Sequence, residues 1–190
     1  MFLGSAAAAI PEYFAIGFSH IFPDGVDHIL FILALFFLTR KFADLLLQLT
    51  FFTLAHSLTL ALSLYGYLQI PTPVVEVAIA LSIVFVAGEN IFKDRPSPWR
   101  PWVIFGSGLI HGLGFAHSFE ETLVGKEEFL PALFSFNLGI EAGQLAVVAI
   151  AWTMVALWWK RESYRRMIAR PASCLIALSG IYWTAERMIQ

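Results

Sequence analysis

The chain has 190 residues, of which 58% are hydrophobic and 14% charged, with a net charge of −2 and a mean hydropathy of +0.73. A soluble domain carries about 25% charged and about 45–50% apolar residues, so these charges are too few to cover a water-soluble globule. The apolar residues gather in runs approaching the length of a membrane-spanning helix, at 26–39, 45–64 and 74–92. The composition therefore predicts an all-α integral membrane protein, with residues 1–190 forming one domain.

Two further counts exclude other classes of protein. The near-neutral charge and the lack of a basic tract argue against a nucleic-acid partner. The single cysteine, Cys174, excludes an internal disulfide and any multi-cysteine metal site. Residues 1–10 are apolar but lack basic residues, so we expect no cleavable signal peptide.

In chain order, the apolar segments predict a polytopic bundle of seven transmembrane helices, at about 5–22, 25–39, 43–66, 73–92, 101–119, 129–159 and 171–188. Prolines separate several of them: Pro23 ends the first, Pro71 and Pro73 precede the fourth, and the stretch 96–101 precedes the fifth. The first segment is short and contains Pro11. If it only dips into the bilayer, six spans are left.

The basic residues predict an orientation. Ten of the twelve fall in segments that the seven-helix pattern places on one side of the membrane: Arg40, Lys41, Lys93, Arg95, Arg100, Lys160, Arg161, Arg165, Arg166 and Arg170. By the positive-inside rule that side is cytoplasmic. Seven spans then put the N-terminus in the cytoplasm and the C-terminus outside, whereas six spans put both termini outside.

The first candidate site consists of His20, Asp24, Asp27 and His28. Ionisable residues inside membrane segments are costly, about 2.5–3.5 kcal/mol on insertion scales, and usually mark function. We expect Asp24 to cap the second helix and to share one face of it with Asp27 and His28, while His20 approaches from the first. Imidazole and carboxylate ligands suit Ni²⁺, Co²⁺, Zn²⁺ or Mn²⁺, so this pattern predicts a metal site at the outer membrane boundary. The alternative is a capped turn with His and Asp hydrogen-bonded to each other.

Further polar side chains lie on predicted spans three to six: His56, Ser57, Glu76, Glu89, Asn90, His111, Asn137, Glu141 and Gln144. We interpret His56, His111 and Glu141 as metal ligands and the others as pathway or supporting residues. For the hydroxyl and amide groups, the alternative is a hydrogen bond to a neighbouring helix, worth about 0.6 kcal/mol.

Glycines at four-residue spacing predict close helix packing. Gly108 and Gly112 lie in the fifth span, and Gly139 and Gly143 in the sixth. Such small-residue faces let backbones approach closely, so we expect the fifth and sixth spans to pack together and to bring His111 toward the stripe that contains Glu141.

Five blocks, in order, resemble the HupE/UreJ family: GFSHIFPDGVDHILF (17–31), FTLAHSLTL (52–60), Glu76 with ALSIVFVAGEN (80–90), FGSGLIHGLGFA (105–116) and FNLGIEAGQ (136–144). The resemblance implies a bacterial inner-membrane metal permease of the kind associated with nickel supply to hydrogenase and urease. It covers most of the chain from residue 17 to 144.

We therefore hypothesise a permease for a divalent transition metal ion, nickel or cobalt first and zinc second, rather than an enzyme. The ion would enter at the His20/Asp24/Asp27/His28 group, pass His56, His111 and Glu141 near the midplane, and leave past Glu89 and Asn90. Scarce Met and Cys argue against a soft-ligand Cu(I) pathway. The expected partners are the metal ion and the lipid bilayer, and homo-oligomerisation is left open.

Three alternatives belong to other functional classes. An intramembrane metal-dependent hydrolase would hold one tight zinc site with an open position, whereas a permease would hold a string of weak sites. A haem or redox subunit would use His56 and His111 as axial ligands. A structural assembly partner would need no metal.

Overall fold

The computed structural model describes residues 3–122 and 129–189, with side chains described for 10–115 and 129–189. The described elements are all helical, and they confirm the seven predicted helices with small shifts at the ends. The α-helices are α1 (Leu3–Ile21), α2 (Val26–Leu38), α3 (Phe42–Leu64), α4 (Thr72–Phe92), α5 (Arg100–Thr122), α6 (Phe129–Val155) and α7 (Arg170–Ile189). A short π-helix, η2 (Arg165–Ala169), precedes α7.

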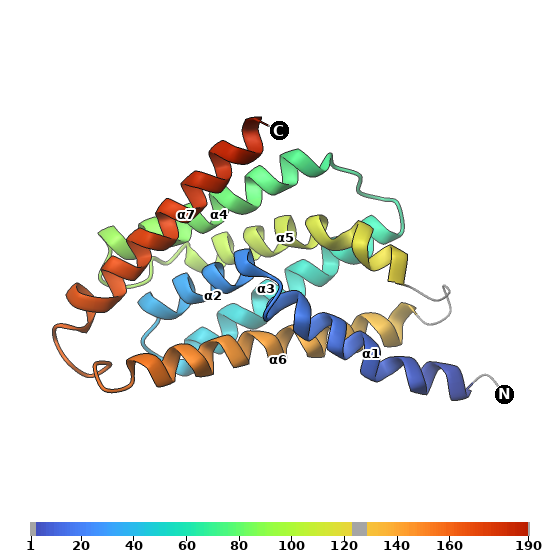
Figure 1. Cartoon of the computed structure of the whole chain (residues 1–190), viewed down its shortest axis with the longest axis horizontal. Helices are drawn as coiled ribbons and strands as arrows, with labels where there is room; N and C mark the ends of the chain where they lie inside the picture. The colour runs from blue at the N-terminus through green and yellow to red at the C-terminus, as the bar shows by residue number, and fades with distance from the viewer. Residues whose placement is uncertain (1–2, 123–128, 190) are drawn as a thin grey trace.

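The helices associate mainly as three pairs. α1 packs on α6, α3 on α5 and α4 on α7, while the short helix α2 contacts both α4 and α6 in the middle of the molecule (Figure 1). The buried aromatic residues Phe31, Phe36, Phe52 and Phe136 fill the space where the pairs meet. The core therefore lies between the pairs rather than along one helix.

The glycine stripes lie at two different interfaces. A methyl group added to Gly112 would collide with the carbonyl oxygen of His56 on α3, and one added to Gly139 would collide with that of Phe14 on α1. The prediction of close packing is thus confirmed, but the predicted partners are wrong: the α5 stripe faces α3, and the α6 stripe faces α1. A small-residue face fits any close neighbour, and its spacing does not specify which one.

We expect Gly112→Ala to destabilise the protein by about 1–3 kcal/mol, because the added methyl group forces α5 away from α3. Gly106→Ala in the same helix is the matched control, since nothing lies within 4 Å of its added methyl group. Gly106→Ala only removes the conformational freedom of a helix glycine, so this control should be as stable as the wild type or slightly more stable. Thermal unfolding of the detergent-solubilised variants measures both. Equal melting temperatures would show that the α3–α5 contact is not close.

Length and hydropathy identify three helices as candidate membrane spans: α3, α4 and α6. Residues 10–21 and α2 pass the test together as a pair bent by 68°. Large apolar side chains cover the outer faces, with Leu54, Phe85 and Phe134 exposed by 60%, 53% and 68%. The chain is therefore a helical membrane protein, but seven separate crossings are not confirmed.

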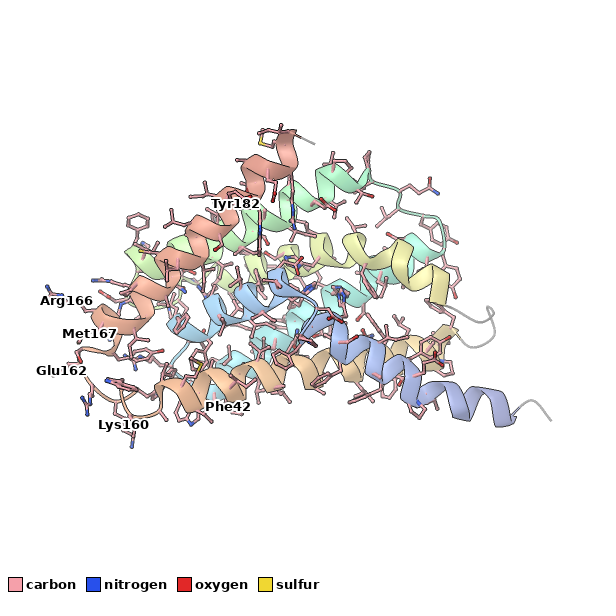
Figure 2. All side chains as sticks on the ribbon, viewed as in Figure 1. Phe42, Lys160, Glu162, Arg166, Met167 and Tyr182 are labelled. Atoms are coloured by element: carbon pink, nitrogen blue, oxygen red, sulfur yellow. The ribbon has the colours of Figure 1, made fainter. Side chains whose placement is uncertain are left out.

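The basic segments meet at one end of the bundle. The α2–α3 turn, the α4–α5 loop and the segment after α6 all lie there, and α1 begins at the opposite end (Figure 1). Lys160 and Arg166 project from this end (Figure 2). Asp94 of the α4–α5 loop accepts hydrogen bonds from Arg165 at 2.5 Å and Arg170 at 3.2 Å. The basic side predicted from the sequence is thus one contiguous surface, which we call the basic end.

Candidate metal centre

The break between α1 and α2 positions the first ligands. α1 ends at Ile21 and α2 starts at Val26 with Gly25 as its N-cap residue, without a side-chain cap. The turn is so tight that a methyl group on Gly25 would collide with the carbonyl oxygen of His20. The expected cap by Asp24 is therefore wrong: Asp24 lies in the turn, exposed to solvent, because the helix begins one residue too late for it.

Four histidines from four helices meet at this break. The ring of His28 on α2 lies 4.6 Å from that of His20 on α1, 5.9 Å from His56 on α3 and 4.8 Å from His111 on α5, between ring centroids. Two overlapping triads have ligand atoms within 4.8 Å of one another: His20 with His28 and His56, and Asp27 with His28 and His111. His28 belongs to both triads and is the centre of the cluster.

Hydrogen bonds assign the protons on two of the rings. The Oδ1 atom of Asp27 lies 2.9 Å from Nδ1 of His28, and a carboxylate only accepts, so Nδ1 carries the proton. Ser82 donates its one hydroxyl proton to the carbonyl of Ile79 at 2.7 Å, so it accepts from Nε2 of His111 at 3.1 Å. The unprotonated nitrogens, Nε2 of His28 and Nδ1 of His111, then face each other at 3.4 Å. In these neutral tautomers the two lone pairs repel, and either a proton on one nitrogen or a metal ion beside both removes the repulsion.

That separation suits a metal ion. Two nitrogens bound to one tetrahedral ion at about 2.1 Å each lie about 3.4 Å apart. Asp27 accepts a hydrogen bond from Nδ1 of His28, and Ser82 accepts one from Nε2 of His111. Imidazoles that bind a metal through one nitrogen commonly donate such a bond from the other. The residues present therefore fit a divalent ion with nitrogen ligands.

His56 lacks the partners that a buried imidazole normally has. It is fully buried, and among the described residues neither of its ring nitrogens has a hydrogen-bond partner. The Nε2 atom of His20 is also buried without a partner in the described part of the chain. An unpaired buried polar group costs about 1–3 kcal/mol, so such groups are typical of a site that binds something.

Aromatic rings enclose the imidazoles. Phe115 lies 3.9 Å from the ring of His20, and Phe52 lies 5.8 Å from that of His28 and 5.1 Å from that of His111, between centroids. These rings keep water from most of the cluster. A low-dielectric surrounding strengthens the attraction between a cation and the Asp27 carboxylate.

One side of the cluster is open. A cavity of about 320 Å³ contacts His20, Asp27, His28 and His111. Its wall includes Asp24 and Glu76, and Arg187 on α7 donates a hydrogen bond to the carbonyl of Glu76 at 2.8 Å. Because α4 starts and α7 ends away from the basic end, the cavity leads toward the opposite side of the bundle (Figure 1).

The expected succession of separate sites is wrong in one respect. The sequence pattern predicts different depths for the first group and for the pair His56/His111, but in the structure their imidazole rings lie within 6 Å of one another. The bend between α1 and α2 carries His20 and His28 into the bundle, which helix periodicity alone does not reveal. The same packing disfavours the haem alternative, because the ring of His28 lies within 6 Å of both His56 and His111 and leaves no room for a porphyrin between them.

The polar stripe of α6 faces α3 instead of joining the histidines. Glu141 accepts a hydrogen bond from Thr50 at 2.9 Å, and Gln144 accepts one from Thr53 at 3.3 Å. Oδ1 of Asn137 and Nε2 of Gln144 are buried without partners among the described residues. Ser57 donates to the carbonyl of Thr53 at 2.6 Å, within its own helix α3 and not to a neighbouring helix. Glu141 is thus outside both triads.

Glu89 and Asn90 belong to a closed network at the basic end. Arg100 is 1% exposed and forms an ion pair with Glu89. It also donates to Gln48 at 3.3 Å, and Asn90 donates to the carbonyl of Ala34 at 2.7 Å. The network therefore joins α2, α3, α4 and α5 and closes this end of the bundle.

Sequence reasoning missed Ser82 and the role of Arg100. Ser82 stands alone in an apolar run, and nothing in its neighbourhood in sequence points to His111. Because Arg100 follows a proline-rich stretch, the sequence alone suggests that it is an exposed loop cation. A signal was present, since Glu89 lies in the last turn of α4 and Arg100 begins α5 at the same end of the bundle.

Comparison with known proteins identifies the family of the chain. The family model described as HupE / UreJ protein matches residues 2–187, nearly the whole chain. No curated protein and no solved structure matches the chain. The family match includes all four clustered histidines and Asp27, and the chain belongs to the HupE/UreJ family.

Proposed function

We propose that the protein is a permease for a divalent transition metal ion, which binds among His20, Asp27, His28, His56 and His111. One observation carries the proposal: Nε2 of His28 and Nδ1 of His111 face each other at 3.4 Å, close to His56, whose ring nitrogens have no partner among the described residues. Membership of the HupE/UreJ family supports transport of a nickel- or cobalt-type ion.

The ligand set orders the candidate metals. Imidazole nitrogens with one carboxylate suit nickel, cobalt and zinc, whereas Cu(I) prefers sulfur. Cys174 is exposed on α7, and no methionine is among the residues that line the cavity of the cluster. Nickel or cobalt is therefore the first choice and zinc the second.

The route follows from the two ends of the bundle. The ion enters through the cavity beside Asp24 and Glu76, reaches the histidine cluster, and leaves toward Glu89 and Asn90 once the Arg100 network opens. The basic end faces the cytoplasm, by the positive-inside rule. α1 and α2 form one bent crossing, giving six crossings and both termini outside. Broken helices of this kind form the central binding sites of many transporters.

We expect Asp27→Asn to reduce metal affinity about 10–100-fold while the protein still folds, because the amide removes the negative charge that supports His28 and attracts the cation. Proteoliposomes that contain a trapped metal-sensitive dye would measure uptake of nickel, cobalt and zinc. Glu186→Gln, a carboxylate change on the exposed part of α7, is the matched control and should match the wild type.

Two results would contradict the permease. Wild-type vesicles that take up metal no faster than protein-free vesicles, although the protein retains metal, would favour the hydrolase. A wild type that neither retains nor transports metal would favour the structural assembly partner.

A further inference from the structure

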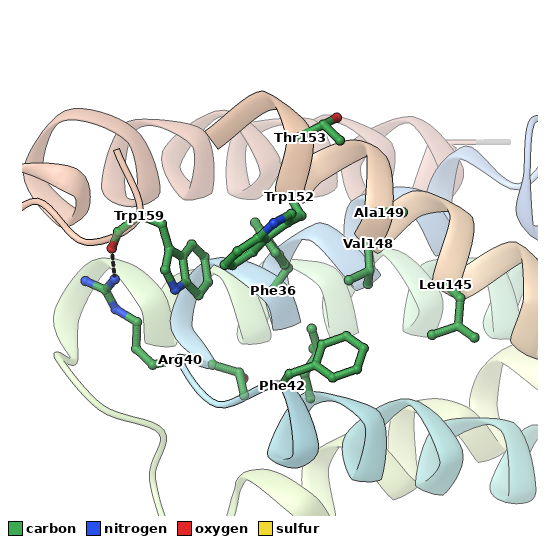
Figure 3. Close-up of a pocket in the computed structure, with 11 residues that line it drawn as sticks. Phe36, Arg40, Phe42, Leu145, Val148, Ala149, Trp152, Thr153 and Trp159 are labelled. Atoms are coloured by element: carbon green, nitrogen blue, oxygen red, sulfur yellow. Dashed lines mark hydrogen bonds between the residues drawn. The ribbon is translucent and has the colours of Figure 1, made fainter. Parts of the chain in front are cut away.

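A second cavity lies on the side of the bundle, away from the histidines. It measures about 600 Å³ and lies between α2, α3 and α6 near the basic end (Figure 3). Its floor includes Phe36, Leu45 and Val148, which are at most 5% exposed. Phe42 and Trp152 on its rim are 60% and 45% exposed. The cavity is thus an apolar groove that opens sideways, which we call the lateral groove.

The lateral groove faces the part of the protein that borders hydrocarbon. Both α3 and α6, which flank it, are candidate membrane spans. Along α6 its lining runs from Leu145 to Thr153, about 12 Å at 1.5 Å per residue. One leaflet of the hydrocarbon core is about 15 Å thick. The groove therefore covers most of one leaflet, which is the depth an acyl chain occupies.

A cation stands at the headgroup end of the groove. Arg40 donates one hydrogen bond to the carbonyl of Trp159 at 2.6 Å, and its guanidinium carbon lies 4.7 Å from the centroid of the Tyr164 ring. A guanidinium has five N–H donors, and no carboxylate among the described residues forms an ion pair with Arg40. The exposed residues Lys41, Lys160 and Arg161 add positive charge nearby.

We propose that the lateral groove binds one phospholipid with an anionic headgroup. Its acyl chain lies against Phe36, Leu45 and Val148, and its phosphate accepts hydrogen bonds from the free donors of Arg40. The groove is apolar along its floor and cationic at its Arg40 end. It is therefore complementary to a lipid with an acyl chain and an anionic headgroup. Basic pockets between membrane helices recognise anionic headgroups by this chemistry.

The test compares lipids retained by the full chain. The protein is equilibrated in nanodiscs of phosphatidylcholine and phosphatidylglycerol at four to one, extracted gently, and its bound lipids are counted by native mass spectrometry. We expect the wild type to retain phosphatidylglycerol with about fivefold enrichment over the disc composition, the preference that one basic residue near anionic lipid provides. Arg40→Gln should bring the ratio back to that of the disc.

Three further variants separate binding from folding. Arg40→Lys keeps the charge and should keep most of the enrichment, even though it changes the bond to Trp159. Ala149→Trp places an indole in the groove and should prevent either phosphatidylglycerol or phosphatidylcholine from binding there. Arg166→Gln, an exposed basic residue at the same end, is the matched control and should behave as the wild type.

Three results would overturn the proposal. The first is a wild-type protein that retains phosphatidylglycerol and phosphatidylcholine in the same ratio as the nanodisc. The second is an Arg40→Gln variant that melts at the same temperature as the wild type and keeps the wild-type enrichment in phosphatidylglycerol, as Arg166→Gln does. The third is a dimer that dissociates with Ala149→Trp, which would make the groove an interface between two copies of the chain.

Discussion

Replacing His56 with phenylalanine is expected to abolish metal retention without harming the fold. His56 is fully buried, and its two nitrogens have no partners among the described residues. Phenylalanine has a similar shape and no polar atoms, and the rings of Phe52 and Phe136 already lie 6.1 Å and 6.5 Å away. The metal-free variant should therefore melt at the same temperature as the wild type or higher, since an unsatisfied buried group costs about 1–3 kcal/mol.

Unlike the melting temperature of the metal-free protein, the metal affinity of His56→Phe should fall. Loss of one ligand should lower the affinity by at least about 100-fold, more than the loss of a supporting residue does. A ligand present at 100 times its dissociation constant stabilises the folded state by about 2.7 kcal/mol, so nickel or cobalt should raise the melting temperature of the wild type only. Elemental analysis of the same samples, equilibrated with a mixture of Mn, Co, Ni, Cu and Zn ions, identifies the ion.

The control for this experiment is Glu12→Gln, which removes an exposed carboxylate on α1. It should leave both metal content and melting temperature unchanged. A His56→Phe protein that is less stable than the wild type and binds metal equally well would make His56 a structural residue and would move the site elsewhere.

The second large effect is expected at Arg100. Arg100→Met should destabilise the protein by about 3–5 kcal/mol, because Glu89 is then a buried carboxylate without its counter-ion. For a chain of this size that corresponds to a fall in melting temperature of roughly 6–20 °C. Arg95→Met in the preceding loop, where the side chain is exposed, is the matched control and should change little.

A double variant tests the cause. Arg100→Met combined with Glu89→Leu removes both charges, so it should be more stable than Arg100→Met alone. Thermal unfolding of the four proteins in one detergent gives the coupling between the two sites. If the double variant is the least stable of the four, the network acts through its other hydrogen bonds and not through the ion pair.

Much of the fold could be predicted because apolar runs and prolines are local features. Each predicted helix is present, and the basic segments do meet at one end. The pairing of helices could not be predicted, since the glycine faces of α5 and α6 allow any close partner. The actual partners depend on the shape of the whole bundle, which the local sequence does not encode.

The candidate site could be predicted in part for a similar reason. The types and spacing of His20, Asp27 and His28 pointed to metal ligation, and the structure keeps them together. Their meeting with His56 and His111 depends on the 68° bend between α1 and α2. Helix spacing specifies which face a residue occupies, but a bend changes how deep that face lies.

The division of the bundle into helix pairs has a consequence for an ion that binds as proposed. His20 belongs to the α1/α6 pair, His56 and His111 to the α3/α5 pair, and Ser82, which supports His111, to the α4/α7 pair. An ion held by these imidazoles would link helices of separate pairs. A shift of one pair by about 1.5 Å, a single helical residue, exceeds the tolerance of a bond of about 2.1 Å. Metal affinity would then depend on how well the three helix pairs are aligned.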